Sequence, residues 1–161
     1  MTVTRRLSDM GNSISEIGPE MLIEKAFLVS KELDTYIDKL TLSLKKFIIS
    51  NPSTDKDFYQ RKLHGLAWYA TYAEALKSIS SWAYELHVQE KFGELERLIL
   101  ILGFNEYLHQ MRGGIFMSQN EIIRPAELDV NGSLSNNLSS DNVLLFLDIN
   151  NIEILKNDFI N

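Results

Sequence analysis

The chain has 161 residues, of which 45% are hydrophobic and 24% charged, the balance of one folded globular domain rather than a disordered chain. Its net charge of −6 disfavours binding to nucleic acids, whose phosphates are contacted by clustered Lys and Arg. It has no Cys, which excludes disulfides, thiolate zinc sites and thiol nucleophiles and fits a reducing compartment.

The sequence contains no segment typical of a membrane protein. The longest apolar run, residues 98–102, is far shorter than the roughly 20 residues that span a bilayer. Arg5-Arg6 is not followed by the apolar stretch of an export signal. We therefore expect a cytoplasmic protein without a membrane partner.

A long first helix is predicted after a polar, flexible lead-in at residues 1–17. It starts at Gly18-Pro19, because Pro is tolerated at the first helical position, and ends at Ser50 before Asn51-Pro52. Apolar residues recur along it every three or four positions, a coiled-coil-like seam that requires a partner helix. The seam consists of Leu22, Ala26, Val29, Leu33, Tyr36, Leu40, Leu44 and Phe47.

A second helix is predicted to open at Ser53-Thr54-Asp55, whose side chains can accept the free N–H groups of its first turn. Two apolar stripes place this helix at the centre of a bundle. One stripe is Tyr59, Leu63, Leu66, Ala70 and Ala73, and the other is Trp68, Tyr72, Ala75, Ile79, Trp82 and Leu86. We expect the polar line His64, Thr71, Ser78 and Glu85 to face solvent, and Tyr69 and Tyr84, which lie off the stripes, to form a contact surface.

A third helix is predicted to end at Gly113-Gly114, because Gly adopts the left-handed cap conformation cheaply. Ser118-Gln119-Asn120-Glu121 has the pattern of a capping box and predicts a short helix closed by Arg124-Pro125. The predicted organisation is a helical bundle domain at residues 18–129, a polar linker at 130–142 and a tail with a short helix at 143–161. The fold class is all-α, an antiparallel up-down bundle of three long helices plus short C-terminal helices.

Two candidate sites are incomplete. Glu106 and His109 have the Glu-x-x-His spacing of di-iron bundles, but those sites need a second such pair and two further Glu on facing helices. His64 has no nucleophile and orienting acid that the sequence pairs with it. We therefore predict no catalytic, cofactor-binding or metal-binding residues. Gly65 costs about 1 kcal/mol relative to Ala inside a helix, which indicates close approach of another helix.

Residues 63–76 and 103–125 carry motifs more specific than a bundle requires. The motifs resemble the N-terminal helical extension of acyl-CoA dehydrogenases of the (2S)-methylsuccinyl-CoA dehydrogenase type, over residues 58–129. The matched positions are His64, Gly65, Trp68, Gly103, Glu106, Tyr107, Gly113, Gly114, Met117, Ser118, Gln119, Glu121, Arg124 and Pro125.

The resemblance implies a domain appended to an FAD-dependent enzyme that oxidises a branched dicarboxylic acyl-CoA thioester. The family's flavin-binding residues and catalytic carboxylate lie outside the matched region, so FAD is expected only in a partner or in a catalytic region beyond this chain. The matched residues then have a structural or docking role. Asn105 and Asn120 stand where Gly is expected and Phe116 where Pro is expected, and an Asn-rich tail follows Asp129, so the chain looks like a detached copy of the extension.

Three hypotheses for function follow from these patterns. The first is a non-catalytic helical interaction domain that docks on an acyl-CoA dehydrogenase-type flavoprotein or self-associates as a homo-oligomer. The second is a bundle that binds a small molecule such as an acyl-CoA between aromatic helices. The third is a remnant of a split acyl-CoA dehydrogenase gene.

Overall fold

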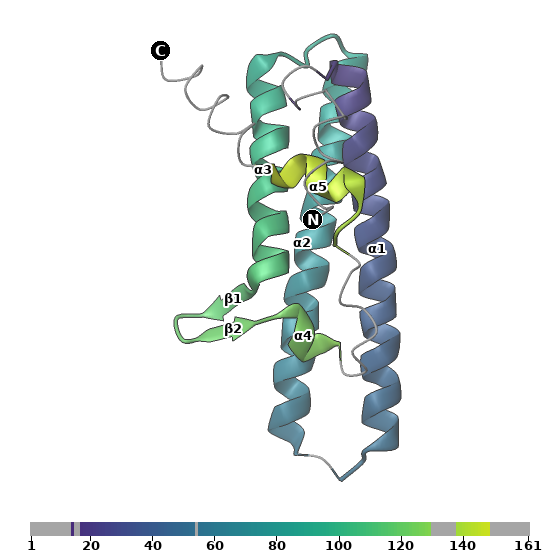
Figure 1. Ribbon diagram of the computed structural model, residues 1–161, viewed down its shortest axis with the longest axis vertical. Helices are drawn as coiled ribbons and strands as arrows, with labels where there is room; N and C mark the ends of the chain where they lie inside the picture. The colour runs from purple at the N-terminus through teal and green to yellow at the C-terminus, as the bar shows by residue number, and fades with distance from the viewer. Residues whose placement is uncertain (1–13, 15–16, 54, 130–137, 149–161) are drawn as a thin grey trace, which may run out of the picture.

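The computed structural model describes residues 14, 17–53, 55–129 and 138–148, and shows three long helices side by side (Figure 1). The chain is mostly helical, and the predicted three long helices and short C-terminal helices are confirmed, but the all-α class is not complete because a two-stranded sheet is also present. None of the described helices is both long and apolar enough to cross a membrane. The elements in chain order are α1 (Pro19–Ser50), α2 (Lys56–Val88), α3 (Glu94–Gly113), β1 (Ile115–Ser118), β2 (Glu121–Ile123), α4 (Pro125–Leu128) and α5 (Asp141–Leu147).

The predicted start and end of α1, start of α2 and end of α3 are confirmed, because each depends on local chemistry. Pro19 occupies the first turn of α1, and Asn51 ends that helix. Asp55 caps α2 by accepting a hydrogen bond from the Asp57 N–H at 3.1 Å. α3 ends where Gly114 takes a φ of +127°, outside the range that residues with a Cβ adopt readily.

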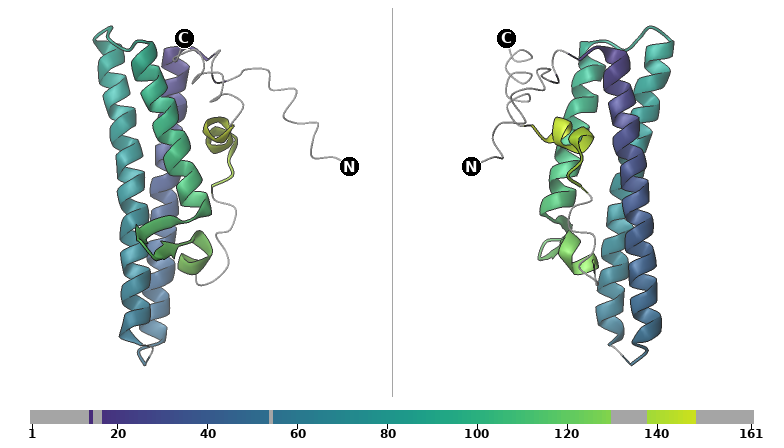
Figure 2. Two further views of the ribbon diagram at one scale, coloured as in Figure 1. Left: turned by 90° about the vertical axis from the view of Figure 1, so that its left-hand side faces the viewer. Right: turned by 45° about the vertical axis from the view of Figure 1, so that its right-hand side comes forward.

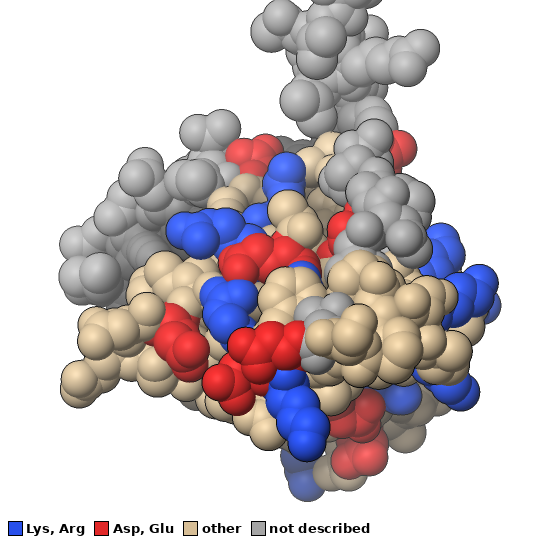
Figure 3. Space-filling view, turned by 90° about the horizontal axis from the view of Figure 1, so that it is seen from below, with Lys and Arg blue, Asp and Glu red and all other residues tan. Residues whose placement is uncertain are grey.

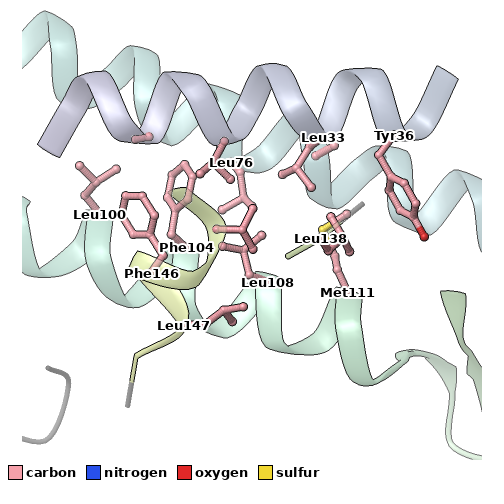
Figure 4. Packing of buried hydrophobic residues seen from close by; sticks show 14 of the residues in the cluster. Leu33, Tyr36, Leu76, Leu100, Phe104, Leu108, Met111, Leu138, Phe146 and Leu147 are labelled. Atoms are coloured by element: carbon pink, nitrogen blue, oxygen red, sulfur yellow. The ribbon is translucent and has the colours of Figure 1, made fainter. Parts of the chain in front are cut away.

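The hydrophobic core lies between the three long helices and is closed by the C-terminal segment. α4 and α5 lie on one side of the long helices (Figure 2). In the core, the Phe146 ring of α5 packs on the Phe104 ring of α3 with 4.6 Å between centroids, and Leu138 and Leu147 reach the same cluster (Figure 4). The α1 seam faces this core: all eight predicted residues are buried except Phe47, which is half-buried.

The core-facing side of α2 differs from the prediction. Its fully buried residues are Lys62, Gly65, Tyr69, Ala73, Leu76, Ser80 and Ala83. Tyr69 is 0% exposed, so the prediction that it forms a contact surface is wrong, whereas Tyr84 is 52% exposed. The spacing missed this face because Lys62, Gly65 and Ser80 are not apolar and interrupted the pattern. The polar line from His64 to Glu85 does face solvent.

The predicted short helix at Ser118 is wrong. β1 and β2 form an antiparallel hairpin in which Ile115 pairs with Ile123 and Phe116 with Ile122. Ile115 and Ile123 are buried while Phe116 is 63% exposed, so alternation across the strands decides the structure over the capping pattern. Pro125 does not close a helix but opens α4, where the Arg124 N–H donates to Glu127 at 3.1 Å.

Both ends of the described chain contribute to the core. Of the predicted lead-in at residues 1–17, Ile14 and Ile17 are described and buried, and the rest lies outside the described residues. The Arg97 guanidinium of α3, itself buried, donates to the backbone carbonyls of Ile14 and Ile17. α5 starts at Asp141, inside the predicted polar linker, with Ser140 as its cap. Residues 130–137 of that linker and 149–161 of the tail lie outside the described part.

Candidate functional site

The matched motif positions come from α2, α3, the hairpin and α4. These elements meet where the chain leaves α3, and the hairpin projects there from the side of the long helices (Figure 1). Gly65 and Gly114, two of these positions, lie against the hairpin residues Ile123 and Ile122. The matched positions at the hairpin tip and Glu106 on the outer face of α3 are exposed apart from the half-buried Met117.

Gly65 lets the hairpin lie directly on α2. A Cβ at this position would be 2.4 Å from Cγ1 of Ile123, closer than unbonded carbon atoms approach, and 3.1 Å from Cβ of Ile123. The close approach predicted for Gly65 is therefore confirmed, but the neighbour is a strand residue and not another helix. Ile123 is fully buried by this contact.

Gly114 directs the chain from α3 into β1. Its φ of +127° strains any residue with a Cβ, and an added Cβ would also lie 2.7 Å from Cγ2 of Ile122. Gly113 has open space where its Cβ would be. Of the predicted Gly-Gly pair, only Gly114 is at a position that requires Gly. There it lets the chain turn from α3 into the hairpin.

Arg61, Lys62 and Glu127 anchor the segment that follows α3, and the sequence analysis did not single them out. Arg61 donates to the Glu127 carboxylate at 2.5 Å and to the Ile122 carbonyl at 2.8 Å. The Lys62 ammonium donates to the Glu127 backbone carbonyl and lies 4.8 Å from the centre of the Phe58 ring. One basic pair on α2 therefore fixes both β2 and α4. Two adjacent basic residues on a helix otherwise rich in apolar residues were the available signal.

The charges of this anchor are adjusted by burial and by each other. Burial lowers the pKa of Lys62. The negative charge of Glu127 offsets part of this lowering, and the positive charge of Arg61 adds to it. Burial raises the pKa of the Glu127 carboxyl, but the hydrogen bond and charge of Arg61 and the N–H of Arg124 outweigh it, so the net pKa is lowered. Glu127 is thus held in its charged form, which the Arg61 contact needs.

A line of aromatic rings continues along α2 above the anchor. The Trp68 indole N–H donates to Nε2 of His64 at 3.0 Å, and Trp68 meets Tyr72 edge to face at 6.3 Å. Tyr72 meets Tyr107 of α3 edge to face at 4.5 Å and donates to the Gln110 side chain at 2.8 Å. Burial, followed by the effect of Tyr107, raises the pKa of the Tyr72 hydroxyl, which keeps it a donor. These residues join α2 to α3 and leave His64 exposed.

The remaining matched residues do not converge. Glu106 is exposed on α3, as is His109 of the same Glu-x-x-His pattern. Arg124 is exposed and Pro125 half-buried at the start of α4. Within the part of the chain that the structure describes, no three His, Asp or Glu side chains come close enough to hold a metal ion. The hairpin tip is exposed apart from the half-buried Met117 and consists of Met117, Ser118, Gln119, Asn120 and Glu121.

The charged surface at the lower end of the molecule is mixed. Basic and acidic side chains are interspersed over the end seen in Figure 3. Binding to nucleic acid requires clustered positive charge. This end of the molecule has no such cluster of positive charge.

No known family model matches the chain. The chain is 36% identical over 132 residues to (2S)-methylsuccinyl-CoA dehydrogenase of Cereibacter sphaeroides. The chain resembles one segment of that dehydrogenase. The alignment covers 81% of this chain but 22% of the relative, so most of the dehydrogenase has no counterpart here.

The resemblance predicted from the motifs is thereby confirmed, and it extends well beyond residues 58–129. Because 81% of the chain is matched, a continuous match must include most of α1, which the motifs did not reach. The region shared with the dehydrogenase is therefore a packed unit of the three long helices, not an isolated motif.

Proposed function

We propose that this chain is a non-catalytic helical interaction domain that docks on an acyl-CoA dehydrogenase-type flavoprotein. The observation that carries the proposal is the match of 81% of the chain to only 22% of the length of a methylsuccinyl-CoA dehydrogenase. A segment of that size, folded around one core, corresponds to a single domain of a larger enzyme. Docking on a separate flavoprotein would pair this domain with the portion of a dehydrogenase that has no counterpart in this chain.

The site supports a binding role. The anchor of Arg61, Lys62 and Glu127 and the close contact of Gly65 with Ile123 hold the hairpin in a fixed position on α2. The hairpin carries the exposed Phe116 away from the helices. A rigidly held element with an exposed aromatic residue presents a preformed contact point. FAD and the acyl-CoA thioester would be bound by the partner.

Co-purification tests the proposal. The full chain, tagged and expressed in its native cell, is expected to bring down a polypeptide with bound flavin and an acyl-CoA dehydrogenase sequence. Light scattering during size exclusion gives the mass of the complex. A strict monomer with no flavoprotein, or oxidation of methylsuccinyl-CoA by the purified chain alone, would overturn the proposal. A pure homo-oligomer would favour self-association instead.

A further inference from the structure

One apolar surface of the molecule is only half covered by the described elements. It is the second stripe predicted on α2, together with neighbouring residues of α3. On α3, Leu95 is 50% and Ile99 44% exposed. The stripe residues of α2 are half-buried, because one side of each packs against the hydrophobic core. We call this surface the α2–α3 stripe, and it consists of Trp68, Tyr72, Ile79, Trp82, Leu95 and Ile99.

The two helices bring these residues into one continuous line. α2 and α3 run in opposite directions (Figure 1), with Tyr72 against Tyr107 and a Cβ at Gly103 only 3.1 Å from Ile79. One turn further along, Trp82 is therefore level with Ile99. From Trp68 to Trp82 the stripe is about 20 Å long at about 1.5 Å per residue, the length of a helix of about four turns.

Acidic residues border the stripe. Glu85 lies one turn beyond Trp82, Glu94 is next to Leu95, and Glu106 lies two turns beyond Ile99; all three are exposed. A second copy of the chain would bring the same carboxylates against them, which like-charge repulsion disfavours.

The basic residues between positions 68 and 106 are engaged elsewhere. Lys77 pairs with Asp34 of α1 at 3.4 Å, and Arg97 is buried against the N-terminal carbonyls. Lys91 lies in the turn between the helices, where its ammonium donates to Gln89 at 3.1 Å. Between residues 68 and 106 the border of the stripe is therefore left negative, and complementary charge must come from the partner.

We infer that the α2–α3 stripe is the docking face for one amphipathic helix of the flavoprotein partner, apolar on one side and flanked by Lys or Arg. Helices recognised in this way contribute apolar anchors every three or four residues, which matches the spacing of the stripe. The inference rests on the proposed function and adds to it the face and the chemistry of the contact.

Substitutions on the stripe test the inference in the tagged full chain. Ile99→Glu is expected to reduce co-purified flavoprotein about tenfold or more, because a loss of about 1.4 kcal/mol at an interface anchor is tenfold in affinity. The matched control is Leu42→Glu, on an apolar residue of α1 that is 52% exposed against 44% for Ile99, and it is expected to leave the yield unchanged. Circular dichroism and thermal melting verify that both variants fold.

A second variant tests the charge without altering apolar residues. Glu85→Lys combined with Glu106→Lys changes only exposed carboxylates, so folding is expected to be retained. We expect it to weaken capture of the flavoprotein, and we expect capture by the unaltered chain to fall as salt is raised. Unchanged or stronger capture by this variant would overturn the predicted chemistry of the partner helix.

A photo-crosslinking residue at position 99 identifies the occupant. A crosslink to a flavoprotein helix with flanking Lys or Arg supports the inference. A crosslink to a second copy of this chain, or wild-type capture by Ile99→Glu, overturns the face while docking itself stands. If the unaltered chain captures no flavoprotein, the proposed function fails, and this inference fails with it.

Discussion

The side-chain amide of Asn105 in α3 donates a hydrogen bond of 2.8 Å to the backbone carbonyl of Phe146 in α5. That carbonyl is among the last of α5 and has no acceptor role within its own helix. Asn105 is 6% exposed, so the bond is shielded from water. Asn105 of α3 thus fastens α5 to the core.

Replacing Asn105 with Ala is predicted to destabilise the fold. It leaves the Phe146 carbonyl buried without its donor, at a cost of about 1–3 kcal/mol. For a chain of this size the melting temperature is expected to fall by about 2–4 °C per kcal/mol. The control is Asn120→Ala at the exposed hairpin turn, which should melt as the unaltered chain does. Equal melting of both variants would show that the bond contributes nothing.

Gly65→Ala is predicted to destabilise the hairpin although Ala favours helices. The new Cβ would lie 2.4 Å from Ile123, and such overpacking costs about 1–3 kcal/mol, more than the roughly 1 kcal/mol gained in helix propensity. Gly113→Ala, with open space around its Cβ, provides the matched control and is expected to be neutral or slightly stabilising. Urea unfolding of the two variants gives the comparison, and a stabilised Gly65→Ala would contradict the contact.

Alkaline pH is predicted to destabilise the folded chain through Tyr36. Burial, with the charge of Asp129, raises the pKa of Tyr36 from 10.0 to about 12. A pKa raised in the folded state gives stability that is complete below pH 10 and is lost as the pH rises towards 12. Tyr36→Phe should therefore lose less stability over this range than the unaltered chain. Urea midpoints at each pH, with the exposed Tyr84→Phe as control, measure the difference.

Acidic pH is predicted to weaken the anchor through Glu127. Its pKa is lowered in the folded state below the ordinary 4.5, so its contribution to stability is present above that value and lost as the pH falls below it. Glu127→Gln is expected to have a shallower loss of stability on acidification. The exposed Glu24→Gln serves as control. An identical acid profile for Glu127→Gln and the unaltered chain would show that Arg61 does not hold the carboxylate charged.

The features that the sequence predicted correctly depend on nearest neighbours along the chain. Pro19, Asn51-Pro52 and Gly114 mark helix ends because their backbone preferences act within one turn. The α1 seam was also recognised, because it is uniformly apolar and regular. These local signals were sufficient for the mostly helical character, for both ends of α1, for the start of α2 and for the end of α3.

The errors arise where residues distant in sequence decide the structure. Lys62 is 8% exposed because its ammonium donates a hydrogen bond to a backbone carbonyl of α4, and no local sequence pattern indicates that partner. Tyr69 is buried because the Met111 carbonyl accepts its hydroxyl at 2.8 Å. The Ser118 to Glu121 pattern suits either a capped helix or a hairpin turn, and the burial of Ile115 and Ile123 selects the hairpin.

Arg97 has a consequence for the order of folding during synthesis. Its guanidinium binds carbonyls that lie 83 and 80 positions earlier in the chain. Those carbonyls, at Ile14 and Ile17, leave the ribosome long before Arg97 does. A contact between residues so far apart in sequence closes a large loop, which costs chain entropy and slows its formation. Ile14 and Ile17 are therefore translated well before α3 but reach their final place only once Arg97 has emerged.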